Sequence, residues 1–315
     1  MYTIQQELEQ CRAMLAADFK HTNPLLDQSL RMVQSRSGKM MRPVLTLLAA
    51  RLFTPVNTNT LHAAVAYEAF HTASLIHDDV VDESNQRRGQ ESINHNQGNK
   101  VAVLVGDYIL SIALHHLSQI GNPRLVDVMS EAAAQLADGE LLQLLGTMSN
   151  ELSEQTYFDI IRAKTAALFA ACAASGAITA GAAEEEVKRM YEFGQLVGIC
   201  FQMKDDIFDY LDNDIGKPTG NDMAEGKLTL PAIYAIRNSK ENLDEIVEKL
   251  KKQTATTDEI RRMVAYIKES GGIEYTEHLM YEHANRAKLI LQHYADSETK
   301  DALMQYVDNV TQRKF

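Results

Sequence analysis

The chain has 315 residues, of which 45% are hydrophobic and 23% are charged, a composition typical of globular proteins. Its formal net charge of −12 argues against a nucleic-acid partner, because phosphate backbones require clustered Lys and Arg. Six prolines, no tryptophan and an abundance of helix-forming residues favour an all-α protein.

The cysteines are widely separated and form no C-x-x-C pair: Cys11, Cys172 and Cys200. This spacing argues against a disulfide framework and against a zinc site. The first ten residues lack the basic start and apolar core of a signal peptide. We therefore expect a cytoplasmic protein with reduced thiols.

Apolar residues recur at helical spacing along most of the chain, and strand-like alternation is nowhere sustained. The predicted helices cover residues 61–77, 101–120, 124–148, 153–175, 184–211, 258–268 and 275–294, with a Gly- and Pro-containing loop at 212–226. The second helix ends at Gly121, just before Pro123, which is a normal helix stop. Because no repeat or low-complexity linker divides the sequence, we predict one domain over residues 1–315.

The uncharged stretch 165–183 is nearly long enough to cross a bilayer. It consists mostly of Ala, Gly, Ser and Thr, which are weakly driven into lipid but allow helices to approach closely. We therefore predict a buried central helix and no transmembrane segment.

Two acidic clusters share the pattern D-D-x-x-D: Asp78, Asp79 and Asp82, and then Asp205, Asp206 and Asp209. On a helix, positions i and i+4 lie on one face, so the outer aspartates of each cluster can share cations. The residues between them are apolar, which predicts that each helix buries its other side: Val80, Val81, Ile207 and Phe208. Two solvated acidic patches are the alternative.

Closely packed carboxylates repel one another, so a bound cation would offset the repulsion. No glycine-centred twelve-residue loop follows either cluster, which argues against an EF-hand calcium site. Sparse oxygen ligands favour magnesium held against a substrate diphosphate.

Basic residues that suit phosphate oxygens flank both clusters. Lys39 and Arg42 are spaced i, i+3 in G-K-x-x-R-P, where we expect a helix to begin. Four further positions are Arg87 and Arg88 after the first cluster and Lys217 and Lys227 after the second. Lys164 and Thr165 begin the Ala-rich helix, and His71 lies two turns before Asp78 on the same helix face.

Together these residues resemble the trans-polyprenyl diphosphate synthase family, over nearly the whole chain. The resemblance rests on five motifs in order: GKMMRP, H-x6-DDVVDES-x2-RRG, AKTA, FQMKDDIFDY and GKPTGNDMAEGKLTLP. It is most similar to members that make medium or long chains, of the octaprenyl type.

The resemblance implies an isoprenoid-synthase fold of long, mostly antiparallel helices around a central cavity, with the two aspartate clusters facing each other across its mouth. It implies that Asp78 and Asp82 bind two magnesium ions and that Asp205, with its neighbours Asp206 and Asp209, binds a third; Asp79 belongs to the same catalytic set. The allylic diphosphate would be contacted by Arg87, Lys164, Thr165, Gln202, Lys217 and Lys227. The diphosphate of isopentenyl diphosphate would be held by Lys39, Arg42, His71 and Arg88.

The implied reaction is ionisation of the allylic diphosphate followed by attack of the isopentenyl double bond. Two positions depart from the family pattern. Where Gly-Gly-Lys-Arg is common, this chain has Ser37, Gly38, Lys39 and Met40, so one cation is absent near the isopentenyl site. Gln86 is polar where an apolar residue is frequent.

Small residues at Ala73 and Ser74, just before the first cluster, resemble those of members that make medium or long chains. An alternative is that they only permit close helix packing. The resemblance also implies a homodimer and transient membrane contact when the product is released. A catalytic subunit of a heteromeric synthase remains an alternative, and a class I terpene cyclase fits less well because it normally lacks the second D-D-x-x-D.

Overall fold

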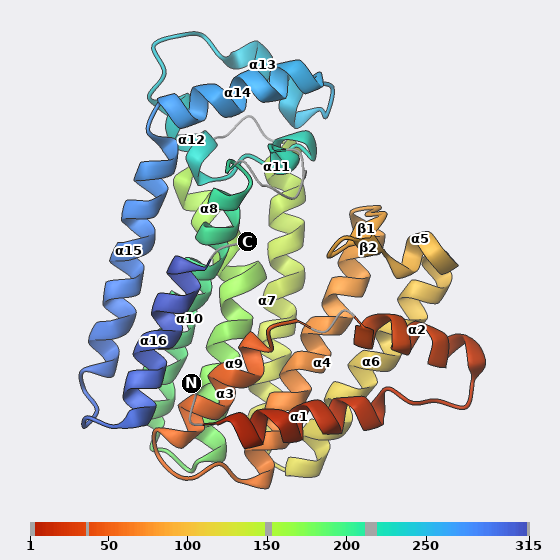
Figure 1. Ribbon diagram of the computed structural model, residues 1–315. Coiled ribbons are helices and arrows are strands. Elements are labelled where there is room, and N and C mark those ends of the chain that lie inside the picture. The colour runs from red at the N-terminus through yellow and green to blue at the C-terminus, as the bar shows by residue number, and fades with distance from the viewer. Residues whose placement is uncertain (1–3, 36–37, 149–152, 212–218, 314–315) are drawn as a thin grey trace. The chain divides into compact units, whose positions relative to one another are not determined.

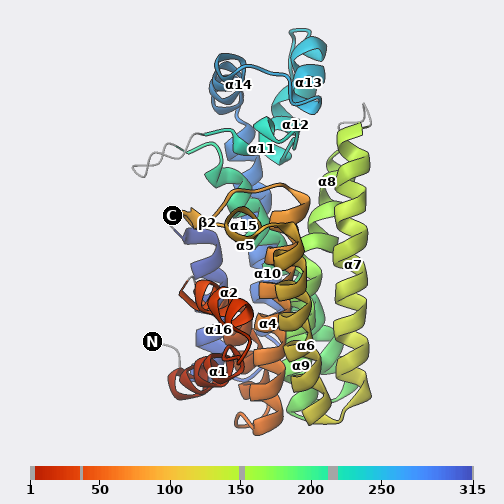
Figure 2. The ribbon, with the colours of Figure 1, turned by 90° about the vertical axis from the view of Figure 1, so that its right-hand side faces the viewer.

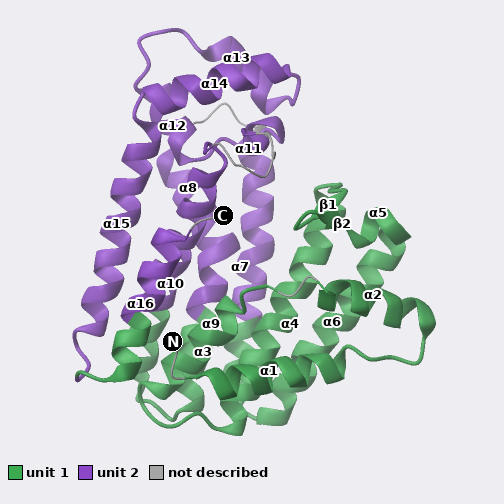
Figure 3. Ribbon diagram, viewed as in Figure 1, with its two compact units in different colours: residues 1–129, 171–191, 296–303 green, residues 130–170, 192–295, 304–315 purple. Residues whose placement is uncertain are grey.

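The computed structural model describes residues 4–35, 38–148, 153–211 and 219–313, which form two compact units that alternate along the sequence (Figure 3). Unit 1 comprises residues 1–129, 171–191 and 296–303, and unit 2 comprises 130–170, 192–295 and 304–315. Four helices contribute residues to both units: α7 (Pro123–Met148), α9 (Ala167–Thr179), α10 (Glu184–Phe208) and α16 (Glu298–Gln312). The single-domain assignment stays a prediction.

Unit 1 is organised around the long helix α4, against which α1, α3 and α6 pack (Figures 1 and 2). Its own elements are α1 (Gln5–Asp18), α2 (Pro24–Ser35), α3 (Met41–Arg51), α4 (Thr58–Val81), β1 (Gln86–Arg87), β2 (Gln90–Glu91), α5 (Ile93–Gln97) and α6 (Asn99–Ile120). Asn57 caps the start of α4 by accepting a hydrogen bond from the Thr60 backbone N–H. The helix continues through Asp78 and Asp79, as the sequence predicted.

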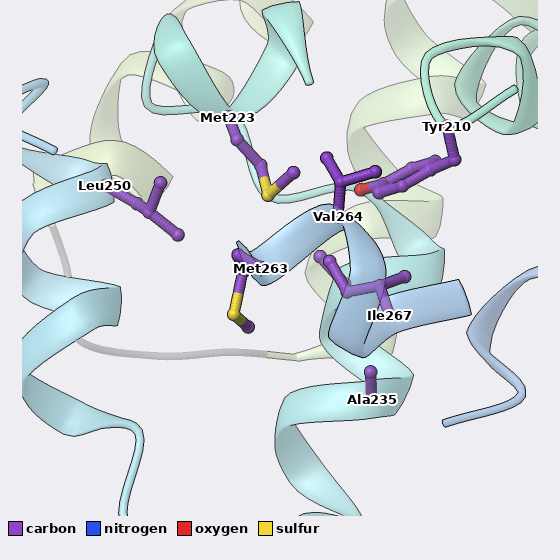
Figure 4. Close-up of a cluster of buried hydrophobic side chains, with 8 residues drawn as sticks. Tyr210, Met223, Ala235, Leu250, Met263, Val264 and Ile267 are labelled. Carbon is purple, nitrogen blue, oxygen red and sulfur yellow. The ribbon is translucent and has the colours of Figure 1, made fainter. Parts of the chain in front are cut away.

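Unit 2 contains the second aspartate cluster and the helices that support it. Its own elements are α8 (Glu154–Ile161), η1 (Arg162–Ala166), α11 (Asn221–Ala224), α12 (Leu230–Arg237), α13 (Asp244–Lys251), α14 (Thr257–Glu269) and α15 (Gly272–Leu291). A cluster of buried side chains joins α11 to α14 (Figure 4). Tyr210 belongs to this cluster, so the chain is anchored directly after Asp209.

The stretch predicted as one helix over 153–175 is helical but not uniform. A five-residue π-helical segment, η1, separates α8 from α9 and contains Lys164 and Thr165. Such π-helical turns are rare in proteins overall, and those that do occur are often located at functional sites. The close packing expected of small residues is present in unit 2, where a β-carbon at Gly198 of α10 would lie 2.5 Å from the Ala166 α-carbon.

Two helical stretches have the length and composition of a membrane span: Asn99–Ile120 and Glu154–Thr179. Length and apolarity alone do not distinguish a span from a core helix. In the most apolar 18 residues of the second stretch 72% are buried, in agreement with the buried helix predicted there. The corresponding window of the first stretch is 44% buried, and Val103, Leu104 and Leu114 of this helix are exposed.

Candidate active site

The first aspartate cluster lies at the C-terminal end of α4. The backbone N–H of Asp82 donates to the Asp78 carbonyl (2.8 Å), so these two residues lie one turn apart on the same face. Asp78 is partly exposed and Asp82 is exposed, whereas Asp79 is buried. Of the two intervening residues expected to be buried, Val80 is only partly buried and Val81 is 63% exposed, because α4 ends there.

A tight hairpin returns the chain to this cluster. Strands β1 and β2 pair Gln86 with Glu91 and Arg87 with Gln90, and both loop residues, Arg88 and Gly89, have positive φ. Positive φ at both loop positions is the geometry of a type I′ turn, which matches the twist of the strands. The left-handed backbone at Arg88 is unfavourable for a residue with a β-carbon, and such strain gathers at functional sites.

The hairpin brings both arginines into contact with the first motifs. Arg87 Nε donates to Asp79 Oδ1 (2.8 Å), and the two side chains form an ion pair. A β-carbon at Gly38 would lie 2.7 Å from a guanidinium nitrogen of Arg88. The glycine of the G-K-x-x-R-P motif is therefore required for Arg88 to occupy this place.

These residues line a cavity of about 320 Å³ in unit 1, which we call the first cavity. Its lining is Arg12, Leu15, Ala16, Phe19, Val33, Gln34, Gly38, Met40, Glu68, His71, Thr72, Leu75, Ile76, Asp79, Arg87, Arg88 and Ile93. Burial, followed by the guanidinium groups of Arg42 and Arg88, lowers the pKa of His71 well below its ordinary value, so the imidazole is neutral at pH 7. Burial raises the pKa of Glu68, although Arg42 and Arg88 oppose this shift.

The two basic residues of the first motif differ in their surroundings. Arg42 is buried in α3, while Lys39 is exposed and precedes the helix, because Met40 is its N-cap with a left-handed backbone. A helix does begin in this motif, as expected, but it begins at Met41, so Arg42 lies on the helix and Lys39 lies just before it. The structure brings His71, Arg87 and Arg88 together in the first cavity, and Arg42 interacts electrostatically with His71 and Glu68.

In the second cluster, the three aspartates have different partners. Arg313 Nη2 donates to Asp205 Oδ1 (2.6 Å), and its guanidinium lies 3.9 Å from the centre of the Phe201 ring. Asp209 accepts backbone N–H groups of Asn221 (2.9 Å) and Asp222 (3.2 Å), at the start of α11. The predicted burial of Ile207 and Phe208 is confirmed.

Asp206 is buried at the centre of a hydrogen-bonded chain. The Tyr157 hydroxyl donates to Asp206 Oδ2 (2.5 Å), and Gln202 Nε2 donates to Asp206 Oδ1 (2.8 Å). Thr165 Oγ1 in turn donates to Gln202 Oε1 (2.7 Å). This chain links η1, α8 and α10, and it connects two predicted diphosphate contacts, Thr165 and Gln202, to the aspartate cluster.

The carboxylates around Asp206 interact unfavourably when all are ionised. Burial, together with Asp205 and Asp209, raises the pKa of Asp206 to about 7, although Tyr157 and Gln202 oppose this shift. Burial, then Asp206 and Asp209, raises the pKa of Asp222 well above its ordinary value. Burial also raises the pKa of Asp209. Positive charge brought to this cluster would therefore stabilise it.

Two of the predicted lysines form ion pairs with glutamates of unit 2. Lys164 Nζ pairs with Glu140 Oε1 (2.6 Å) and donates to Gln143 Oε1 (3.0 Å), both on α7. Lys227 Nζ pairs with Glu225 Oε2 (2.9 Å). Lys217 lies outside the described residues.

These groups surround a second cavity, of about 210 Å³, in unit 2. Its lining is Gln143, Gly146, Ser153, Thr156, Tyr157, Ile160, Ile161, Lys164, Thr165, Gln202, Asp206, Asp222, Gly226, Lys227, Leu228, Thr229, Ile233 and Lys251. Four predicted allylic-diphosphate contacts thus meet in one cavity: Lys164, Thr165, Gln202 and Lys227. Arg87, assigned by resemblance to the same diphosphate, lines the first cavity.

Sequence reasoning did not single out Tyr157, Asp222, Glu68, Arg12 or Arg313. Asp222 stood within the quoted GKPTGNDMAEGK motif, midway between Lys217 and Lys227, which was an available signal. Glu68 lies one turn before His71 on the same helix, so its spacing was also a signal. Tyr157 and Arg313 are distant in sequence from the aspartates that they contact, and Arg12 is distant from α4 and the hairpin, so spacing gave no signal for these three. Ala73 is buried and the Ser74 hydroxyl donates to the His71 carbonyl (2.9 Å), and neither residue lines either cavity.

Comparison with known proteins identifies the family. The sequence model of the polyprenyl synthetase family matches residues 23–267. The chain belongs to the polyprenyl synthetase family. The predicted all-α fold of the isoprenoid-synthase type and the prenyltransferase class are thereby confirmed.

Three relatives illustrate the similarity. An octaprenyl diphosphate synthase of Haemophilus influenzae is 34% identical over 300 residues, covering 95% of this chain and 91% of that protein. A protein of Geobacillus stearothermophilus named heptaprenyl diphosphate synthase component 2 is 36% identical over 282 residues, covering 89% and 87%. The crystal structure of a geranylgeranyl pyrophosphate synthase from Bacteroides thetaiotaomicron is 45% identical, with a TM-score of 0.88, covering 98% and 97%.

Proposed function

We propose that this trans-prenyltransferase binds isopentenyl diphosphate in the first cavity and an allylic diphosphate at the second cavity, and joins them into a linear polyprenyl diphosphate. The observation that carries the proposal is that each aspartate cluster adjoins its own cavity lined with basic side chains. Two diphosphate substrates require two separate cationic sites, because each diphosphate needs its own charge-assisted hydrogen bonds.

The second cavity has the donors needed for a leaving diphosphate. Lys164 and Lys227 contribute positive charge, and Thr165 contributes a hydroxyl whose single proton, donated to Gln202 in this structure, would turn to a diphosphate oxygen when substrate binds. Lys164 is positioned before reaction by its contact with Glu140, so that it stabilises charge as it develops. Lys217 is proposed as a further contact from the family pattern.

Magnesium is proposed as the cofactor, in three ions, and the donor set fits it. Within the described residues, no three acidic, His or Cys side chains are arranged to hold a metal alone. Magnesium retains water and uses one or two carboxylates together with substrate phosphates, so sparse carboxylates suit it. Asp78 and Asp82, with Asp205 and its neighbours, would hold the ions, which when bound would supply positive charge to the departing diphosphate.

The reaction breaks the bond between the allylic carbon and the diphosphate oxygen, whose electron pair leaves with the diphosphate. The isopentenyl double bond then attacks the allylic cation, a new carbon–carbon bond forms, and a proton is lost to the released diphosphate. The neutral imidazole of His71 lacks the charge of an imidazolium, so it can hold a diphosphate oxygen through its N–H without repelling the cation. The apolar wall of the first cavity, which includes Leu75 and Ile76, excludes water from the isopentenyl hydrocarbon.

The product is proposed to be of medium or long chain length. Small residues at Ala73 and Ser74 support this proposal by resemblance. The curated relatives named for octaprenyl and heptaprenyl products agree with it, while the Bacteroides thetaiotaomicron structure is named for the shorter geranylgeranyl product.

We also propose a cytoplasmic homodimer that contacts membranes transiently as product is released. The exposed face of α6 supports the dimer, because Leu104 and Leu114 are 67% and 54% exposed. The Leu114→Lys variant should shift the mass measured by light scattering toward the monomer. The control, Leu289→Lys on α15, removes a similarly exposed leucine and should leave the mass unchanged.

The test of the function is incubation with isopentenyl and farnesyl diphosphates, with and without magnesium, followed by mass spectrometry of the products. We expect a magnesium-dependent ladder that ends at one length. The second candidate is the catalytic subunit of a heteromer, which the relative named component 2 favours. Well-folded protein that elongates farnesyl, geranyl or geranylgeranyl diphosphate only after a partner is added would support that candidate and refute the homodimer.

A further inference from the structure

The first cavity lies between one face of α1 and one face of α4. From α1 it is lined by residues 12, 15, 16 and 19, and from α4 by residues 68, 71, 72, 75, 76 and 79. Both sets follow the i, i+3, i+4, i+7 spacing of a single helical face. On α1 the charged Arg12 is followed by apolar lining residues, whereas on α4 the apolar Leu75 and Ile76 lie between polar residues, with Glu68 at one end and Asp79 at the other.

Among the residues that line the cavity, the charges outside α1 cancel: the acids are Glu68 and Asp79, the cations are Arg87 and Arg88, and His71 is neutral. Arg42 interacts with Glu68 and His71 but does not itself line the cavity. Arg87 is already paired with Asp79. A diphosphate carries at least two negative charges at neutral pH, so it requires a lining with net positive charge.

Arg12 provides that net charge. It is exposed, and it makes no hydrogen bond or ion pair with the part of the chain that the structure describes. Its neighbours Cys11 and Leu15 are buried, and α1 packs against α3 and α4 (Figure 1). The helix therefore holds Arg12 in the lining of the cavity. A guanidinium offers a planar fork of donors that matches phosphate oxygens.

Met40 lines the same cavity at the position where the family pattern commonly has arginine. Its side chain is 4% exposed and contributes no charge. We propose that Arg12 of α1 binds the diphosphate of isopentenyl diphosphate and replaces the cation that is absent at position 40. The inference rests on the proposed function, because it assigns a further binding residue to the same site.

The experiment compares Arg12→Gln with the control Arg31→Gln, which removes an exposed arginine that pairs with Asp27 on α2 and does not line the cavity. Loss of one charge-assisted contact should raise the KM for isopentenyl diphosphate and its dissociation constant in calorimetry by about tenfold. The KM for farnesyl diphosphate should stay within about twofold of the control, and the Tm should stay within about 2 °C of the control. The double variant Arg12→Gln with Met40→Arg should recover most of the lost affinity.

Equal isopentenyl affinity in Arg12→Gln and Arg31→Gln would overturn the assignment, as would an equal rise in the KM of both substrates. No recovery in the double variant would overturn the replacement of the cation at position 40. Failure of the proposed function looks different, since wild-type protein would then neither bind isopentenyl diphosphate in calorimetry nor elongate farnesyl diphosphate.

Discussion

The substitution of Gly139 by alanine tests whether α7 and η1 lie so close together that only glycine fits at position 139. A β-carbon at Gly139 would lie 2.8 Å from Ala163 Cβ and from Lys164 Cγ, and 2.9 Å from the Lys164 backbone nitrogen. Separations this short force the π-helical segment to move, and overpacking of this kind costs about 1–3 kcal/mol. Alanine also gains about 1 kcal/mol of helix propensity over glycine. We expect a net loss of about 1 kcal/mol.

Gly146 on the same helix provides the matched control, because its β-carbon would approach only Ile160 Cδ1, at 3.9 Å. There the propensity gain is unopposed, so Gly146→Ala should stabilise the protein by up to about 1 kcal/mol. At about 2–4 °C per kcal/mol, the two variants should differ in Tm by about 4–8 °C in a thermal melt.

Gly139→Ala should also lower kcat by about a hundredfold, because a displacement near 1 Å of a substrate-positioning group has effects of that size. Shifts of Tm of the same sign and size in both variants would refute the reasoning. So would a Gly139→Ala enzyme with normal kcat.

Two further predictions concern titratable groups outside the aspartate clusters. Burial raises the pKa of each thiol to about 12: Cys11, Cys172 and Cys200. Native protein at pH 8 should therefore resist alkylation by iodoacetamide, whereas all three cysteines should react in guanidinium, and mass spectrometry measures both outcomes. A site alkylated quickly in native protein would contradict its burial. In the capping box of α14, the Thr256 backbone N–H, followed by Lys249, lowers the pKa of Glu259 to about 2. The ionised Glu259 side chain therefore stabilises the folded protein fully above pH 4.5, and this contribution is lost as the pH falls from there toward 2. Glu259→Gln should therefore weaken the fall in Tm over that window, and an unchanged pH profile would contradict the assignment.

The long helices were predictable because their signals are local. Helix α4, which ends at Val81, has no interior Gly or Pro, and Gly121 ends α6 with the positive φ expected of a helix stop. The two aspartate clusters were recognisable from the sequence because the same D-D-x-x-D spacing occurs twice.

The remaining site geometry depends on contacts that spacing does not encode. Arg313 and Asp205 are 108 residues apart, and Tyr157 and Asp206 are 49 apart. The exposure of Val81 follows from the position at which α4 ends, which sequence patterns locate only to within a few residues. The left-handed backbone of Met40, which separates Lys39 from α3, has no signal in a non-glycine residue.

The π-helical segment η1 has the character of a single extra residue accommodated inside an otherwise regular helix. Each residue advances an α-helix by about 100°, so an extra residue built as regular helix would turn everything beyond it by that angle. The wider π turn takes up the extra residue instead, and the Ala-rich face of α9, whose glycine and alanines permit close packing, keeps the direction in which it packs. The π turn therefore meets two demands on one helix: it presents Lys164 and Thr165 to the second cavity, and it leaves α9 in the orientation that the core requires.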